Sequence, residues 1–341
     1  MRTDQPSAAE HLADRLALSE RTGDRDELRQ RLSRLPAGHP SSPVDADGTP
    51  RPPERGLGGG REAADAADRR PLTDAEHAEH VTQVKERLDK ARADGLATDR
   101  QYTIDRARQV WTDQRDALHD AIIEDLYARA ADVPCERRAI IAGGLPGAGK
   151  TTILDHHAGI DRSQYLTINP DNIKEEMARR NMIPAVSGLT PMEASDLVHE
   201  ESSYIARQLG LRAQADGKNV IWDITMSSRP SVERRIDELR SSGYTKIEGI
   251  FVDIPIEVSV TRADSRYREG HDDYRAGCGF GGRLVPDEVT RAQADSDWGS
   301  RNRRTFEDVK HHFGSWCRFD NSGSSPVLVE AGGRREHHDY H

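Results

Sequence analysis

A glycine-rich motif at residues 144–151 constrains the fold more than any other part of the sequence. It reads Gly-Leu-Pro-Gly-Ala-Gly-Lys-Thr and fits the pattern G-x-x-x-x-G-K-[S/T] at every position. An apolar run, Ala139–Ala142, precedes it, and a helical pattern begins at Lys150. In such a strand–loop–helix unit, the glycines let successive backbone N–H groups point at phosphate oxygens. We therefore predict a phosphate-binding loop in an α/β fold.

The residue types of this loop suggest how a nucleotide binds. The helix that follows the loop presents the positive end of its dipole to an anion. Lys150 supplies a charge for the β- and γ-phosphates, and the Thr151 hydroxyl is a ligand for Mg²⁺. We expect ATP and Mg²⁺ to bind here. The residues expected to contact ATP are Gly144, Pro146, Gly147, Ala148, Gly149, Lys150, Thr151 and Thr152.

From residue 138 onward, short apolar runs alternate with helical patterns. Such an alternation predicts a parallel sheet with right-handed crossovers and helices on both faces. After the first strand, the predicted strands are Tyr165–Ile168, Asn219–Asp223, Ile247–Ile254 and Pro326–Val329. The predicted helices between them are Asn172–Met182, a helix from the Thr190–Glu193 capping box to about Asp216, and Pro230–Ser241.

The first part of the chain differs from the rest in composition. Its first aromatic residue is Tyr102, and a hundred residues without an aromatic side chain rarely form an independent core. Helices are expected from near Thr73, with Val84 and Leu88 on one face, and over Asp105–Ala131. The expected organisation is a largely disordered charged extension and linker (1–72), a helical segment that packs on the catalytic domain (73–132), the catalytic domain (133–332) and a disordered tail (333–341).

Charge and cysteine content limit the class of protein. The net charge is -10, which argues against a general nucleic-acid binder. The three cysteines lie far apart and have neither metal-ligand nor disulfide spacing. No apolar run reaches the roughly 20 residues that a membrane span needs. We expect a cytoplasmic protein without a membrane or nucleic-acid partner.

Two carboxylates and two arginines are candidates for the chemistry. Asp171 and Asp223 end predicted strands, and sites in parallel sheets lie at these carboxyl ends. Asp171 is placed to act as a base or, alternatively, to cap the following helix. Asp223 suits a magnesium role through water, or is a simple turn residue. Arg266 and Arg283 lie in a glycine-containing segment with the pattern of a lid, where arginines can neutralise charge on a transferred phosphoryl group.

The motifs together resemble the zeta-toxin family of P-loop kinases from bacterial toxin–antitoxin systems. The similar segments are Gly143–Thr152, Ile168–Asn172, Gly217–Thr225, Arg266–Tyr267 and Gly281–Pro286. The resemblance implies a nucleoside-monophosphate-kinase-like sheet of strand order 2-3-1-4-5. It also implies transfer of the γ-phosphate of ATP to the 3′-hydroxyl of UDP-N-acetylglucosamine, which would poison cell-wall synthesis.

The resemblance also assigns residue roles. Asp171 matches the catalytic base, Arg266 and Arg283 match the arginines on the transferred phosphate, and Asp223 and Thr225 match residues that line the sugar-nucleotide pocket. Asp223 replaces the usual glutamate, a departure that concerns the acceptor site. Ile224 stands where a glycine is common, and Ser227 stands where an arginine is expected.

Other functions fit the same residues. The acceptor can instead be another small hydroxyl compound, such as an antibiotic or a nucleotide, or a polynucleotide 5′-end. A protein of another class, a nucleotide-switched binding module, needs the loop but no base. A toxin-type kinase needs restraint, either by an antitoxin protein or in cis by the helices before residue 132.

Overall fold

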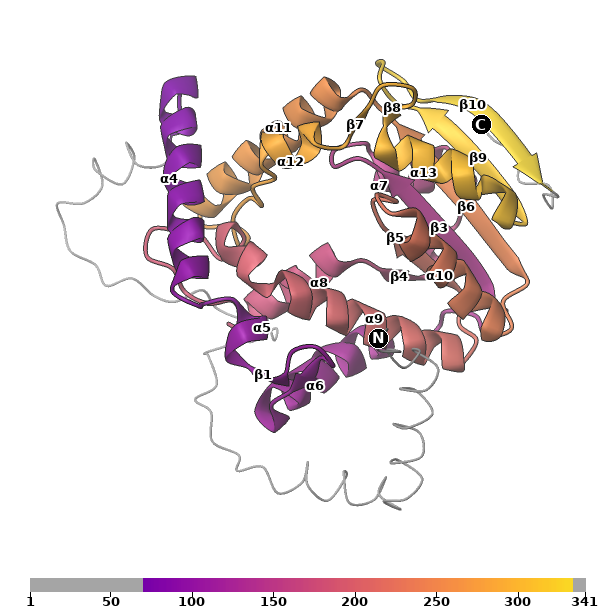
Figure 1. Cartoon of the computed structure of the whole chain (residues 1–341), viewed down its shortest axis with the longest axis horizontal. Coiled ribbons are helices and arrows are strands. Elements are labelled where there is room, and N and C mark those ends of the chain that lie inside the picture. The colour runs from indigo at the N-terminus through magenta and orange to yellow at the C-terminus, as the bar shows by residue number, and fades with distance from the viewer. Residues whose placement is uncertain (1–69, 334–341) are drawn as a thin grey trace, which may run out of the picture. The chain divides into compact units, whose positions relative to one another are not determined.

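The computed structural model of this chain describes residues 70–333 (Figure 1). The expectations for residues 1–69 and 334–341 lie outside the described residues. The first described elements precede the predicted catalytic domain. They are α4 (Asp74–Ala93), α5 (Thr98–Gln101), β1 (Thr103–Asp105), β2 (Val110–Trp111) and α6 (Asp113–Arg129).

A six-stranded sheet organises the rest of the described chain, and its order is β10-β9-β6-β3-β5-β4. All neighbouring strands in it are parallel except β9 and β10. Its strands are β3 (Arg138–Gly144), β4 (Leu166–Ile168), β5 (Val220–Asp223), β6 (Lys246–Asp253), β9 (Ser315–Asp320) and β10 (Val327–Gly333). The predicted α/β fold with a mostly parallel sheet is confirmed.

Helices connect the parallel strands of this sheet, and a small hairpin of β7 (Ala294–Asp295) and β8 (Gly299–Ser300) lies in the connection between β6 and β9. The α-helices are α7 (Lys150–His156), α8 (Pro170–Arg179), α9 (His199–Ala215), α10 (Arg229–Ser241), α11 (Ile256–Arg275), α12 (Asp287–Arg291) and α13 (Arg301–Val309). The short 3₁₀ helices are η1 (Arg162–Gln164), η2 (Glu193–Val198) and η3 (Lys310–His312).

The alternation of side chains along the strands divides the core into two layers. On β3, Ile141 belongs to the core under α9, α10 and α13, whereas Ile140 and Ala142 face the layer that contains α7. On β6, Phe251 and Val252 are divided in the same way. Successive side chains of a strand point to opposite faces, so a continuous apolar run indicates a strand that is buried on both sides. This burial fixes the carboxyl ends of the strands, where the site forms.

The prediction of the last strand was wrong. The fifth parallel strand is β9, Ser315–Asp320, which the sequence reading did not find. The predicted strand at Pro326–Val329 corresponds instead to the start of β10, which pairs antiparallel with β9 at the edge of the sheet. The strand β9 alternates half-buried polar residues with buried Cys317 and Phe319, so it has no continuous apolar run.

The helix predicted over Asp105–Ala131 is shorter in the structure. Residues 103–111 form the β1–β2 hairpin, in which Gln109 has a positive φ of 54°, and α6 begins only at Asp113. Trp111 is buried but lies on the hairpin, and Val110 is 43% exposed. The apolar residues on the two sides of this boundary are at helical spacing, but they belong to a hairpin and to a helix.

Two further helix boundaries differ from the prediction. The helix expected at Asn172–Met182 is α8, which begins at Pro170 and is capped by Asn169 rather than by Asp171. The Thr190–Glu193 capping contacts are present, but they open the 3₁₀ helix η2, and α9 begins only at His199.

The helices before the P-loop strand pack on the domain through both apolar and ionic contacts. Val84 and Leu88 of α4 form a small core with η2 and the loop before it. On α6, Arg115 and His119 both contact the fully buried carboxylate of Glu201 on α9, at 2.5 and 2.6 Å. Charged groups are rarely buried unless they are paired. This cluster therefore fixes how α6 lies against α9.

The described helices include none that is both long and apolar enough to cross a membrane. Cys135 and Cys278 are exposed, whereas Cys317 is buried.

Candidate active site

The glycine loop between β3 and α7 has the backbone that the motif predicts. Gly144, Gly147 and Gly149 have φ values of 149°, 71° and 83°, a region that side chains disfavour. A Cβ atom on Gly144 would lie 2.5 Å from the Val252 carbonyl oxygen, and one on Gly149 would lie 2.5 Å from the Asn321 side chain. Glycine at these positions is therefore required both by conformation and by the close approach of neighbouring strands.

Two side chains from outside the motif hold the loop in place. Ser259 of α11 donates a hydrogen bond to the Pro146 carbonyl at 2.6 Å. Asn321, which follows β9, donates to the Ala148 carbonyl at 2.8 Å. Sequence reasoning missed both residues, because neither is close to the loop in the chain. Their contacts fix the carbonyl side of the loop.

A chain of polar contacts links the P-loop lysine to the predicted base. Lys150 Nζ lies 3.5 Å from Asp223 Oδ1 at the end of β5. The other oxygen of Asp223 accepts a hydrogen bond from Asn169 Nδ2 at 2.8 Å, and Asn169 Oδ1 accepts one from the Asp171 N–H at 2.7 Å. The structure thus brings Lys150, Asp223 and Asp171 to the same edge of the sheet. Asn169, which the prediction omitted, connects them.

Both predicted lid arginines lie at this edge. Arg283 NH2 contacts Asp171 Oδ2 at 2.7 Å. Arg266 lies on α11 and is exposed, although its guanidinium is partly desolvated. This desolvation, together with the charge of Arg283, lowers the pKa of Arg266, while Asp171 and Asp223 act in the opposite direction. The two arginines therefore share one electrostatic environment with the two carboxylates.

The position of Arg283 depends on the two glycines before it. Gly281 has a φ of 99°, and a Cβ atom there would collide with the side chain of Thr190. A Cβ atom on Gly282 would collide with the Tyr267 carbonyl on α11. Gly277 and Gly279, in contrast, have open space around them. The first two glycines of the segment thus have space for a side chain, whereas the last two do not. The close packing of Gly281 and Gly282 places Arg283 beside Asp171.

A second cation contacts the predicted base, Asp171, and was not predicted. Lys174, one turn further along α8, has its Nζ 3.5 Å from Asp171 Oδ1 and is only 4% exposed. Burial lowers the pKa of Lys174, and Asp171 partly offsets the effect. The three-residue spacing between Asp171 and Lys174 is the sequence signal from which this pair could have been predicted. Asp171 is therefore held between Lys174 and Arg283.

The remaining predicted residues differ in their surroundings. Thr151 and Thr152 are exposed in the first turn of α7. Thr225 is exposed beyond β5; its hydroxyl contacts Ser227 and its carbonyl accepts a hydrogen bond from Asn302. The hydroxyl of Thr151 and the carboxylate of Asp223 are hard oxygen donors, which are the ligands that Mg²⁺ prefers. The residues present thus fit a magnesium site beside the loop.

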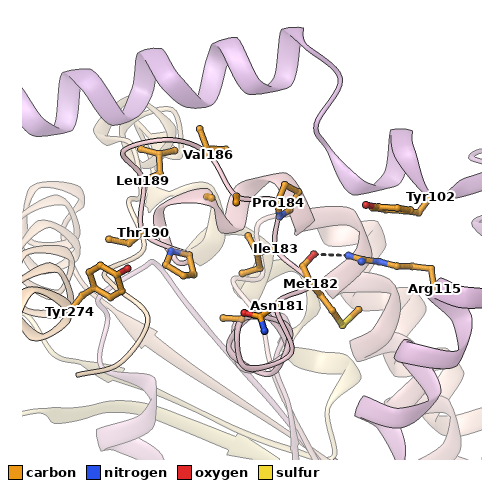
Figure 2. A pocket seen from close by; sticks show the side chains of 14 residues that line it. Tyr102, Arg115, Asn181, Met182, Ile183, Pro184, Val186, Leu189, Thr190 and Tyr274 are labelled. Atoms are coloured by element: carbon orange, nitrogen blue, oxygen red, sulfur yellow. Dashed lines mark hydrogen bonds between the residues drawn. The ribbon is translucent and has the colours of Figure 1, made fainter. Parts of the chain in front are cut away.

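A separate pocket of 460 Å³ lies where the loop of residues 181–191 meets the N-terminal segment and Tyr274 of α11. Figure 2 shows Tyr102 and Tyr274 on its walls and the hydrogen bond from Arg115 to the Met182 carbonyl, which is 2.7 Å long. None of the predicted site residues lines it. The predicted chemistry therefore belongs to the edge of the sheet and not to this pocket.

The fold and the site define a P-loop protein of the kinase type, with a phosphate loop, a carboxylate and paired arginines at one edge of a parallel sheet. The family model described as "Zeta toxin" matches residues 129–304. This chain belongs to the zeta toxin family. No curated protein matches the sequence.

Several solved structures are similar to this chain. The AvrRxo1-ORF1:AvrRxo1-ORF2 complex crystallised with ATP has 18% identity and a TM-score of 0.53, and covers 69% of this chain and 76% of that chain. The same complex with sulphate ions has 19% identity and a TM-score of 0.51, with 65% and 69% covered. The PezAT toxin–antitoxin structure from Streptococcus pneumoniae has 16% identity and a TM-score of 0.45, with 65% and 83% covered. At these identities the likeness concerns the fold.

Proposed function

We propose that this chain is an ATP-dependent kinase that phosphorylates a sugar hydroxyl, the 3′-hydroxyl of UDP-N-acetylglucosamine, as the toxin of a toxin–antitoxin system. The observation that carries the proposal is the contact chain from Lys150 through Asp223 and Asn169 to Asp171 and Arg283. A protein that only binds nucleotide has no need of a carboxylate and paired arginines beyond the loop. Membership of the zeta toxin family supports the same reaction class.

In the proposed reaction, the acceptor hydroxyl gives its proton to the Asp171 carboxylate while its oxygen attacks the γ-phosphorus. The bond from phosphorus to the bridging β-phosphate oxygen breaks, and ADP leaves. Lys150 neutralises charge on the phosphates, and Mg²⁺, when bound, supplies further positive charge to the same oxygens. Catalysis of this kind depends mainly on positioning and on charge stabilisation.

The ion pair between Arg283 and Asp171 has a role before and during this step. Without substrate, it orients the carboxylate and keeps the arginine at the site. When a phosphate arrives, Arg283 can exchange part of this contact for the phosphate oxygens, and Arg266 lies beside it for the same purpose. Burial, and next the charge of Arg283, lower the pKa of Arg266, and an anionic substrate would favour its charged form.

The acceptor is the part of the proposal that most needs a test. Both oxygens of Asp223 are engaged, one with Lys150 and the other with Asn169. The contact with Lys150 supports a water-mediated magnesium role for Asp223 rather than a contact with the acceptor. Another small hydroxyl acceptor therefore remains the alternative, and Thr225 is the exposed residue that would contact it.

The decisive experiment supplies the purified protein with ATP and Mg²⁺ and either UDP-N-acetylglucosamine or a panel of antibiotics, nucleotides and polynucleotide 5′-ends. Mass spectrometry then identifies any acceptor that gains one phosphate. We expect phosphorylated UDP-N-acetylglucosamine with the unmodified chain and none with Asp171→Asn. Transfer only to another panel member would correct the acceptor, and ATP binding without any transfer would favour the binding module.

Restraint of the kinase can also be tested. A separate antitoxin is the proposed partner, and the alternative is inhibition in cis by the N-terminal helices. If the restraint acts in cis, deletion of residues 1–100 raises turnover. Unchanged turnover in a folded deletion variant would discard that alternative.

A further inference from the structure

A cluster of metal-binding side chains lies where the N-terminal helix α4 meets α11, away from the phosphate loop. His80 comes from α4, Glu193 from η2 and His271 from the last part of α11. One potential ligand atom from each of these residues lies within 4.8 Å of the others. Three segments that are far apart in the chain thus bring two imidazoles and one carboxylate together.

The distances within the cluster centre on one carboxylate oxygen. Glu193 Oε1 lies 2.7 Å from His80 Nε2 and 3.2 Å from His271 Nδ1. Ligand atoms around a tetrahedral Zn²⁺ ion stand roughly 3.3 Å apart when the bonds are about 2.0 Å long. The contact with His271 already has this spacing, and the contact with His80 needs to open by about half an ångström.

One nitrogen of this cluster has no hydrogen-bond partner. His271 is 8% exposed, and its Nδ1 is buried without a partner even though it lies close to the carboxylate. A buried polar atom of this kind calls for a physical explanation. A metal ion accepts the nitrogen lone pair, which the surrounding structure leaves unused. The His80 side chain remains 18% exposed, which gives an ion a path from solvent.

The surroundings also prepare Glu193 to act as a ligand. Its second oxygen accepts the Thr190 N–H at 2.7 Å, and the Tyr267 hydroxyl donates to Oε1 at 2.7 Å. Outer contacts of this type orient the ligands of metal sites. The carboxylate is therefore fixed in direction.

We propose that His80, Glu193 and His271 bind a divalent transition-metal ion, with Zn²⁺ as the best match to two imidazoles and one carboxylate. The fourth position would be taken by water or by the Tyr267 hydroxyl. The bound ion clamps α4 onto α11, the helix that also carries Arg266. The site thus links a segment outside the family match to the lid of the kinase site, and it stands whether or not the proposed reaction is correct.

Zinc binding to the full chain tests this proposal, with metal content and calorimetric titration as readouts. His80→Ala and His271→Ala should each lower the affinity for Zn²⁺ by roughly 100-fold or more, because each removes a ligand. His77→Ala is the matched control, since His77 lies on the same helix and contacts Asp264 instead. It should retain the tight site.

Two additions keep the test decisive. Other histidines, including His311 and His312, can bind Zn²⁺ weakly. The quantity to compare is therefore the difference in Zn²⁺ affinity between the ligand variants and the control. Added Zn²⁺ should raise the melting temperature of the unmodified chain and of His77→Ala, but not of His80→Ala. If a ligand variant fails to fold by circular dichroism, His80→Gln and His271→Gln replace it. Equal zinc affinity in ligand and control variants would overturn the proposal.

Discussion

The edge of the sheet at the phosphate loop and the seam between α6 and α9 both contain carboxylates paired with basic residues, but their exposure differs. Asp171 is 40% exposed in its side chain, and Arg283 is 26% exposed. Glu201 has no exposure, and its partners Arg115 and His119 are 9% and 2% exposed. Pairs of the first kind are open to solvent, and we propose that they exchange partners with a substrate, whereas pairs of the second kind contribute to one fixed packing. The same residue types thus lie in the candidate site at one place and in a packing seam at the other.

The largest expected effect concerns the phosphate edge. Lys150→Ala removes the positive charge that we propose neutralises the phosphates, and Asp171→Asn removes the proposed proton acceptor. Each should lower turnover by about 10³-fold or more with little change in the free energy of unfolding. Transfer of labelled phosphate from ATP measures the first quantity and urea unfolding the second. Full turnover in Asp171→Asn would refute its role as base.

The lid arginines should show a similar but more selective loss. Arg266→Ala and Arg283→Ala are each expected to reduce kcat on the order of 10³-fold, by analogy with arginines that stabilise transferred phosphoryl groups. Arg268→Ala is the matched control on α11, because its side chain contacts Asp264 and Asp74 rather than the site. A loss in the control as large as that in Arg266→Ala would mean that the helix, not the guanidinium, matters.

Substitutions in the seam between α6 and α9 should change the stability of the fold. Glu201→Ala leaves Arg115 and His119 buried without their partner, and we expect a loss of about 3 kcal/mol in the free energy of unfolding. The neighbour Glu200 is exposed, so Glu200→Ala should stay within about 0.5 kcal/mol of the unmodified chain. Denaturant unfolding compares the two, and equal effects would contradict the contrast between seam and surface.

The smallest expected effect is a pH dependence of the same seam. Burial alone lowers the pKa of His119, but the nearby carboxylates of Asp116 and Glu201 more than offset this and raise it above 6.5. A raised pKa contributes stability that is fully present below pH 6.5 and is lost as pH rises through the folded-state pKa.

The measurement compares the unmodified chain with His119→Gln. The difference in free energy of unfolding should be largest at about pH 5.5 to 6 and shrink toward alkaline pH. Other groups cancel in the difference, because both chains contain them. A difference that stays constant with pH would show that His119 contributes by packing alone.

The sequence predicted the phosphate loop well because the motif is local: the glycine conformations and the helix start follow from residues 144–151 themselves. It also indicated the buried strands, whose apolar runs are continuous. It missed β9, because a half-buried strand beside an antiparallel edge has no such run. It merged the β1–β2 hairpin with α6, because apolar residues on both sides of Thr112 fall at helical spacing by coincidence.

For the site, the sequence named the charged residues but not the partners that hold them. Asp171, Arg266 and Arg283 were found from motifs, whereas Asn169, Ser259 and Asn321 are ordinary polar residues with no pattern. Nothing in the sequence separates Glu201 from Glu200 beside it. Glu201 is buried and Glu200 is exposed because α6 packs against the face of α9 that carries Glu201.

The amino-acid sequence alone determined that a phosphate loop lies between a buried strand and a helix, since local backbone requirements decide that arrangement. Only the tertiary structure decided which distant side chains meet there, and which histidines gather between α4 and α11. The contacts of Ser259 with Pro146, of His80 with Glu193 and of Arg283 with Asp171 each join residues more than a hundred positions apart, and no local preference of the chain encodes them.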